Sequence, residues 1–104
     1  MLITTQKYNA GEVVAFKLSN GDEVVAKVVE DNTDNYVIDS PCTVMPSQQG
    51  LGLIQSIFSA EKDVKVTLNK LHVMMTAPVI DQMRDHYSKT TTGIETVRKP
   101  GIIV

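Results

Sequence analysis

Five consecutive polar residues, Asp31-Asn32-Thr33-Asp34-Asn35, interrupt an otherwise apolar region of the chain. Carboxylate and amide groups of this kind can bind a metal ion, contact a ligand or bond the backbone of a turn. A calcium loop of the EF-hand type is excluded, because its sixth and twelfth positions would be Tyr36 and Cys42 instead of glycine and glutamate. Two interpretations stay open: a turn in which the side chains bond nearby amides, and a ligand-binding loop.

Cys42, His72 and His86 are the residues best suited to nucleophilic catalysis. No elbow motif surrounds Cys42, and the scattered carboxylates form no acid–base pattern, so we expect a protein that is not an enzyme. The single cysteine excludes an internal disulfide. No spacing of histidine and cysteine matches a metal site, and we expect neither a metal nor a cofactor. His72 is interpreted as an outward-facing strand residue.

The composition predicts one folded domain: 104 residues, of which 42% are hydrophobic and 21% charged. No apolar stretch approaches the ~18 residues of a membrane span, and the first residues lack the pattern of a signal peptide. We therefore expect a cytoplasmic protein with no membrane contact. The net charge of -2 opposes strong binding to nucleic acid, although basic residues are concentrated after residue 60.

Strong strand signals at 13–19 and 22–30 flank an Asn-Gly pair, which predicts a β-hairpin. A two-residue loop would place apolar residues of one strand opposite charged residues of the other. A three-residue loop with Gly21 left-handed instead places Phe16 opposite Val24, and we favour this register. It collects one apolar face, made of Val14, Phe16, Leu18, Val24, Ala26 and Val28. The other face is also partly apolar, which predicts strands that are covered on both faces or bend around a small barrel.

Three more strands are expected, separated by one long connection. Residues 36–45 form the third strand, in which Pro41 indicates an edge or a bulge, and Tyr36 packs rather than stacks on a ligand. In the connection, 46–62, an apolar stretch at 51–58 either folds back to extend the hairpin or meets a neighbouring subunit. Apolar and polar residues alternate along the fourth and fifth strands, but the alternation shifts by one residue at Asn69-Lys70. Such a shift indicates a tight turn or bulge between the two strands.

A change to helical periodicity predicts a helix at 78–89, with Pro78 in its first turn. Its apolar stripe, made of Ile80, Met83 and Tyr87, either caps an open barrel end or faces a partner; we favour the cap. Residues 1–12 form an N-terminal segment. Residues 90–104 are expected to be a flexible tail, whose last Ile-Ile-Val could dock on the domain.

The stretch LSNGDEVVAKVV, followed by Asp31 and Asn35 four residues apart, resembles the first signature of the Sm-like superfamily, which includes the bacterial RNA-chaperone rings. VTLNKLHVMMTAP is similar to the second signature, and the resemblance covers 13–77. Small Sm-like proteins of tailed bacteriophages are the most similar members. Four residues depart from the family pattern: Ala26 replaces a glycine, Thr33 a stacking residue, and Asn69-Lys70 an Arg-Gly pair.

The resemblance implies a mainly β fold: a small, strongly bent, five-stranded antiparallel open barrel of the SH3 type with a C-terminal helix. It also implies a cyclic homo-oligomer of about five to seven subunits, joined through the fourth and fifth strands of neighbouring copies. The function it implies is single-stranded RNA binding without catalysis. The residues implied for RNA contact are Asp31, Thr33, Asn35, Asn69 and Lys70.

Each of these residues has an expected role in the RNA-binding hypothesis. Asn35 would bond base edges, Asp31 would hold the loop geometry, and Lys70, repeated around a ring, would attract the phosphate backbone. The alternative is an oligomeric scaffold or adaptor of phage origin, found in the host cytoplasm, with a protein partner at 47–62 or on the helix. Three features favour the alternative: the missing stacking residue, the missing arginine and the net negative charge of the chain. The Asp31 and Asn35 spacing favours RNA.

Overall fold

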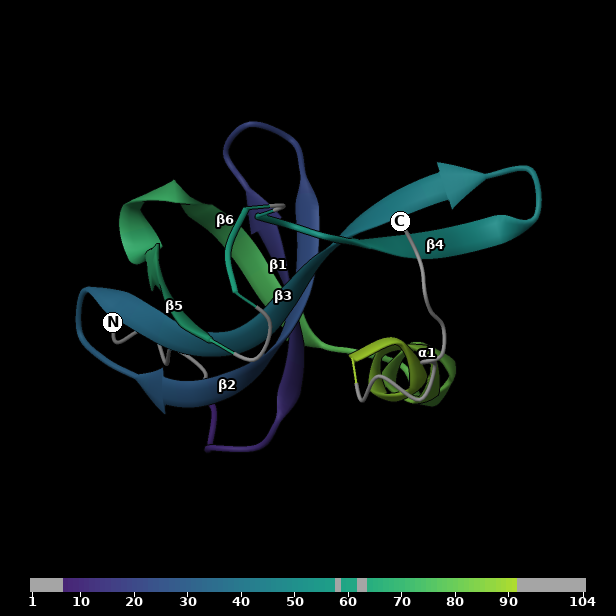
Figure 1. The fold of residues 1–104 in the computed structure, drawn as a ribbon. Coiled ribbons are helices and arrows are strands. Elements are labelled where there is room, and N and C mark those ends of the chain that lie inside the picture. Colours follow the sequence, from purple (N-terminus) through teal and green to yellow (C-terminus); the bar gives the residue numbers. More distant parts are fainter. Residues whose placement is uncertain (1–6, 58, 62–63, 92–104) are drawn as a thin grey trace.

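The computed structural model describes residues 7–57, 59–61 and 64–91. The described chain is mainly β: an antiparallel sheet of six strands that does not close, followed by one helix (Figure 1). Along the sheet the strands follow the order β4-β3-β2-β1-β6, and β5 pairs with β3 as well. The bounds are β1 Val13–Leu18, β2 Glu23–Asp31, β3 Asn35–Ser47, β4 Gly50–Gln55, β5 Lys65–Asn69, η1 (a 3-10 helix) Lys70–His72, β6 Val73–Pro78 and α1 Asp81–Thr91.

The hairpin of β1 and β2 has the predicted register. Phe16 lies opposite Val24 and Val14 opposite Ala26. Gly21 has a φ of 97°, a backbone conformation that glycine adopts without the clash that a Cβ would cause. The predicted three-residue loop is therefore confirmed.

The long strand β3 organises the sheet, because it pairs with β2 along one edge and with two strands along the other. Residues 35–39 pair with β5, and residues 42–47 pair with β4. The expected long connection thus contains β4, which folds back on β3, so that the sheet has six strands rather than five. The paired ends of β3 and β4, residues 42–55, project from the rest of the sheet and are called the arm below (Figure 1).

Pro41 lies in a bulge of an interior strand. Val25 of β2 pairs with Cys42 and Lys27 pairs with Asp39, so that one residue of β2 faces two residues of β3. Ser40, the other residue of the bulge, has a φ of 51°. Of the two predictions for Pro41, edge or bulge, the bulge is confirmed, since a bulge removes the need for a ladder N–H at this point.

Two apolar clusters lie on opposite faces of the same strands, because successive residues of a strand point to opposite sides. The inner cluster contains the buried residues Tyr8, Val14, Phe16, Ala26, Val28, Tyr36 and Ile38. The outer cluster contains the buried residues Val25, Cys42, Val44 and Tyr87. The predicted cover on both faces is confirmed.

The helix differs from its prediction in start and in position. Pro78 is the last residue of β6, opposite Val14, and α1 begins at Asp81. An edge strand tolerates the missing N–H of proline at this point. Tyr87 and Met83 pack on the outer cluster, so that the helix covers the outer face of the sheet instead of a barrel end, and Ile80 is 68% exposed. No helix in the described ranges has the length and apolar character needed to cross a membrane.

The N-terminal segment contributes to the core. Tyr8 is 3% exposed in the inner cluster, and its hydroxyl lies 2.8 Å from Oγ1 of Thr76 in β6. An isolated tyrosine before the first strand gave no pattern that predicts this burial. Residues 90 and 91 belong to α1, and the rest of the predicted tail, 92–104, lies outside the described residues.

Candidate functional site

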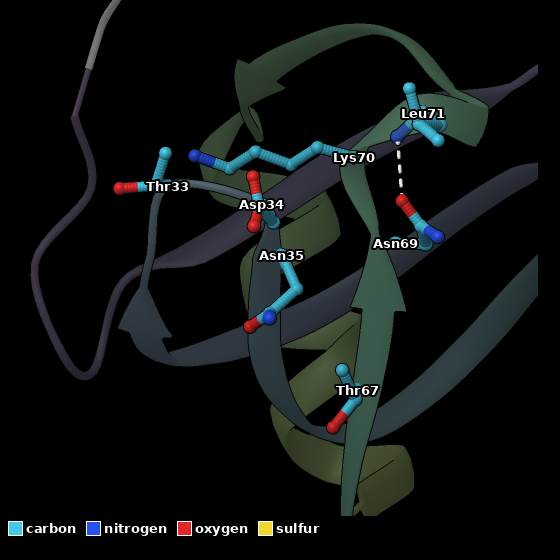
Figure 2. Close-up of a pocket in the computed structure, with 7 residues that line it drawn as sticks. All are labelled: Thr33, Asp34, Asn35, Thr67, Asn69, Lys70 and Leu71. Atoms are coloured by element: carbon cyan, nitrogen blue, oxygen red, sulfur yellow. Dashed lines mark hydrogen bonds between the residues drawn. The ribbon is translucent and has the colours of Figure 1, made fainter.

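An open hollow of about 540 Å³ lies between the turn that joins β2 to β3 and the end of β5 (Figure 2). The antiparallel pairing of β3 with β5 brings these distant segments together, with Asn35 opposite Asn69. The Lys70 N–H then donates to the carbonyl oxygen of Asp34 at 3.0 Å and fixes the two segments to each other. The hollow is lined by Thr33, Asp34, Asn35, Thr67, Asn69, Lys70 and Leu71.

Two amide side chains in the hollow use their oxygen to stabilise the local backbone. Asn35 Oδ1 accepts a hydrogen bond of 2.9 Å from Nδ2 of Asn32, within the turn. Asn69 Oδ1 accepts one of 2.9 Å from the backbone N–H of Leu71 and caps η1, the bond drawn dashed in Figure 2. Because an amide side chain has an acceptor and two donors on separate atoms, both residues retain an NH₂ group that can donate to a ligand.

Lys70 is held by an ion pair with Asp31. Its Nζ lies 2.7 Å from Oδ1 of Asp31, and the two side chains are 27% and 5% exposed. The other oxygen of Asp31, Oδ2, accepts a hydrogen bond of 3.0 Å from the N–H of Tyr8. Burial alone would raise the pKa of Asp31, but the hydrogen bonds from Lys70 and Tyr8 and the nearby positive charges outweigh it, so that the pKa lies below its ordinary value.

The same lysine covers the ring of Tyr36. Nζ of Lys70 lies 4.5 Å from the ring centroid, a cation–π distance. Tyr36 is 5% exposed and its ring packs against Phe16, with centroids 5.0 Å apart. Burial raises the pKa of Tyr36. The prediction that Tyr36 packs is therefore confirmed, and this ring offers no open face to a base.

Four of the five residues predicted for the site, Thr33, Asn35, Asn69 and Lys70, line the hollow. The fifth, Asp31, does not line the hollow but forms the ion pair with Lys70. Asp31 bonds Lys70 and Tyr8, while the Asn35 side chain bonds Asn32. The role expected for Asp31 in the loop geometry stays a prediction.

Three lining residues were missed, namely Asp34, Thr67 and Leu71. The register of β5 against β3 places Thr67 there, and the sequence alone gives no signal for that register. Asp34 and Leu71 are sequence neighbours of predicted residues, and their adjacency was the signal that could have found them. The predicted break at Asn69-Lys70 is confirmed as the 3-10 helix η1. His72, predicted as an outward-facing strand residue, is exposed but lies in η1 instead of a strand.

None of the candidates for catalysis, Cys42, His72 and His86, lines the hollow. Cys42 is buried, its Sγ donates to the carbonyl oxygen of Ser40 at 3.6 Å, and burial raises the pKa of the thiol to about 11. A thiol with that pKa is a poor nucleophile near neutral pH. Within the described ranges, no three His, Cys, Asp or Glu side chains are grouped in a way that could hold a metal ion.

The chemistry of the hollow is that of a polar binding site with more donors than acceptors. Asn35, Asn69 and Lys70 offer N–H groups, Thr33 and Thr67 offer hydroxyls, and Asp34 supplies a carboxylate. Leu71, 86% exposed, is an apolar surface at its edge. In comparisons with known proteins, no family model matches this chain, and no curated protein matches it either.

Proposed function

We propose that the protein is a ring-forming, Sm-like RNA-binding protein without catalytic activity, and that the hollow holds bases of single-stranded RNA. One observation carries the proposal: Thr33, Asn35, Asn69 and Lys70, chosen from two separate segments of the sequence, line one hollow. Hydrogen-bond donors that converge on an open concavity are suited to the edges of unpaired bases.

The strand path supports the Sm-like part of the proposal. Without β4, the order β6-β1-β2-β3-β5 is that of five strands in a bent sheet whose two outermost strands, β5 and β6, are joined by the short turn η1. The family resemblance implies such a break between its last two strands. The arm and α1 are then additions to the minimal fold.

The outermost strands support self-assembly. Among the described residues, β6 pairs only with β1 and β5 only with β3, so that each leaves an edge of backbone N–H and C=O groups open. Such edges are templates for pairing with another chain. Leu71, Met74 and Met75 are 86%, 65% and 65% exposed beside the edge of β6. Pairing of β6 in one copy with β5 in the next would satisfy the open edges and bury these side chains.

The polar groups of the hollow also indicate which bases fit. Uracil has two carbonyl oxygens that can accept from the amide groups of Asn35 and Asn69, and its N3–H can donate to Asp34. Adenine presents an amino donor beside a ring-nitrogen acceptor, and the Asn35 and Asn69 oxygens that could accept from that amino group are already bonded. No aromatic side chain lines the hollow in the described residues, so that the stacking contribution of roughly 1–3 kcal/mol per base is missing. Useful affinity for RNA then depends on the hollows of several subunits contacting one RNA strand at once.

The test is a titration of the protein with short uridine-rich and adenine-rich RNA at several salt concentrations, combined with light scattering for the mass. We expect a multiple of the chain mass, and tighter binding to the uridine-rich RNA that weakens as salt rises. No binding at low salt would eliminate the RNA-binding function, because electrostatic attraction is greatest there. A monomer in dilute buffer would eliminate the ring.

Two variants assign the roles within the hollow. Asn35→Ala should reduce the preference for uridine, because it removes an amide that contacts the base edge. Lys70→Met keeps the aliphatic stem over Tyr36 but removes the charge, and should weaken binding to both RNAs. Lys89→Met on α1 is the matched control, since it removes one positive charge outside the hollow and should leave binding nearly unchanged. Equal effects of the two lysine variants would argue against a site at Lys70.

A second candidate function, a scaffold or adaptor of phage origin that does not bind RNA, is favoured by a specific observation. Lys70 is already neutralised by Asp31, which weakens its attraction for phosphate. The arm also carries the exposed apolar side chains Met45, Leu51 and Ile54, which fit a protein interface. An oligomer that binds neither RNA at low salt would be the result expected for this candidate.

A further inference from the structure

A second concavity lies between the arm and the start of α1. Figure 1 shows the arm and α1 on the side of the molecule away from the turn between β2 and β3. We call this concavity the groove. It has a volume of about 330 Å³ and is lined by Gly50, Leu51, Ile80, Gln82, Met83 and His86. None of these residues lines the hollow.

The groove is apolar and uncovered by the described part of the chain. Leu51 is 55% exposed and Ile80 is 68% exposed, while Met83 joins the groove to the outer cluster. Aliphatic side chains that face water around one concavity favour a covering segment, since each buried CH₂ contributes about 0.8 kcal/mol. The groove continues the packed surface between sheet and helix, so that a covering segment would extend an existing core.

We propose that the last three residues of this sequence, Ile102, Ile103 and Val104, occupy the groove of their own chain. They are the most apolar run that follows α1, and they are β-branched side chains of the kind that pack against leucine, isoleucine and methionine. Gly93 follows the end of the helix by two residues, a position from which the chain can reverse its direction. Pro100 and Gly101 then precede the apolar run and allow a second change of direction.

The length of the connecting chain fits this placement. Ile80 and Met83 lie eleven and eight residues before Thr91, which corresponds to about 12–16 Å along a helix. The ten residues 92–101 can span up to about 33 Å when extended. The connection therefore reaches the groove with chain to spare, and a contact within one chain benefits from a high effective concentration.

The charges around the groove agree with the proposal. Asp85, exposed on α1 beside His86, forms no ion pair among the described residues. Arg98 and Lys99 stand three and four residues before Ile102, where they can approach this carboxylate once residues 102–104 are in place. An exposed pair of this kind adds little stability, but it orients the segment. The segment would cover the surface on α1 and the arm that a protein partner would otherwise contact.

Methionine methyl groups provide the test, because they lie at three separate places. Met83 lines the groove, Met45 lies on the arm outside it, and Met74 and Met75 lie on β6. We would record ¹³C-methyl NMR spectra of the full chain and of the double variant Ile102→Asp/Ile103→Asp, with and without a soluble nitroxide. In the variant, the Met83 signal should shift and be broadened more strongly by the nitroxide, while the signals of Met74 and Met75 stay unchanged.

The double variant Ile94→Asp/Val97→Asp is the matched control, since it places the same two charges after the helix but outside the apolar run, and it should leave Met83 as in the unaltered chain. An unchanged Met83 signal in the double variant would overturn the proposal. Dilution of the unaltered chain is a second check. If dilution moved the Met83 signal to its position in the double variant, the proposal would also be overturned, because the groove would then be filled by a second copy. RNA binding at the hollow is measured separately, so that either proposal can fail without the other.

Discussion

The inner and outer clusters lie on opposite faces of the same strands, yet they are closed in different ways. The inner cluster is closed by the N-terminal segment through Tyr8 and by the ion pair of Asp31 with Lys70. The outer cluster is closed by α1, through Tyr87. One face of the sheet thus depends on a charge, and hence on pH, while the other depends on a neutral hydroxyl.

The hydroxyl of Tyr87 compensates for the bulge in β3. It accepts a hydrogen bond of 3.1 Å from the N–H of Lys27, and its hydrogen is shared between the carbonyl oxygens of Asp39 at 2.8 Å and Ser40 at 3.0 Å. Lys27 and Asp39 flank the bulge and Ser40 lies in it, at the point where the register of β2 and β3 shifts. Burial raises the pKa of Tyr87, so that the hydroxyl keeps its hydrogen over the ordinary pH range. A helix that looks like an appendage therefore completes the hydrogen bonding of the sheet.

The largest expected effect tests whether the two clusters fold together. Phe16→Ala removes a fully buried ring from the inner cluster and should lower the free energy of unfolding by about 3–5 kcal/mol. Because β2 places Ala26 and Val28 in the inner cluster and Val25 in the outer one, helix and sheet should be lost in one transition. Urea unfolding followed by circular dichroism and by tyrosine fluorescence measures both quantities.

Met74→Ala is the control for this substitution, since Met74 is 65% exposed and should change stability little. Two separate transitions in the unaltered chain would contradict the shared-strand argument. They would show that α1 and the outer cluster unfold independently of the inner cluster.

The next effect compares the two tyrosine hydroxyls. Tyr87→Phe leaves the N–H of Lys27 and two carbonyl oxygens buried without this partner, and should cost about 1–3 kcal/mol. Tyr8→Phe removes only a bond to the Thr76 hydroxyl, which can rotate towards another partner, and should cost less, about 0.5–1.5 kcal/mol. Thermal or urea unfolding of both variants gives the comparison. An equal or larger cost for Tyr8→Phe would mean that the bulge groups do not depend on Tyr87.

Local signals in the sequence predicted the strands and the hairpin well. The Asn-Gly pair and the alternation around it specify the register of β1 and β2, because a shift by one residue would expose the apolar face. Pro41 predicted an edge or a bulge for a local reason too, because proline has no backbone N–H to donate to a ladder. The burial of Tyr8 and the position of α1 depend on contacts between distant segments, and no local pattern reports such contacts. The strand β4 was foreseen only as one of two alternatives, since its apolar run fits either a partner strand or a partner subunit.

The membership of the candidate site was predicted in part, and its electrostatics were not predicted. A polar turn and a polar break in the strands indicated Asn35 and Lys70, and the pairing of β3 with β5 brings them together. The sequence could not show that Asp31 would neutralise Lys70, because the two residues are 39 positions apart and meet only in the folded sheet. The interaction of Lys70 with the ring of Tyr36 has the same origin.

The last comparison separates the charge of the inner cluster from its packing. Asp31→Asn keeps an oxygen that can accept from the Tyr8 N–H but removes the charge that holds Lys70, and should cost about 1–2 kcal/mol at neutral pH. The pKa of Asp31 is lowered in the folded state, so its contribution is complete above the unfolded pKa of about 3.9 and is lost as pH falls through the folded value. The stability difference between the unaltered chain and the variant should therefore shrink on acidification.

Urea unfolding at a series of pH values from neutral to acid measures that difference directly. Tyr87→Phe is the matched comparison, because its cost arises from neutral groups and should stay constant over the same pH range. If the cost of Asp31→Asn did not change with pH, the ion pair would contribute nothing and the carboxyl would act only as an acceptor for the Tyr8 amide. If instead the cost of Tyr87→Phe fell together with that of Asp31→Asn, the two faces of the sheet would share one electrostatic dependence, and the contrast between them would not hold.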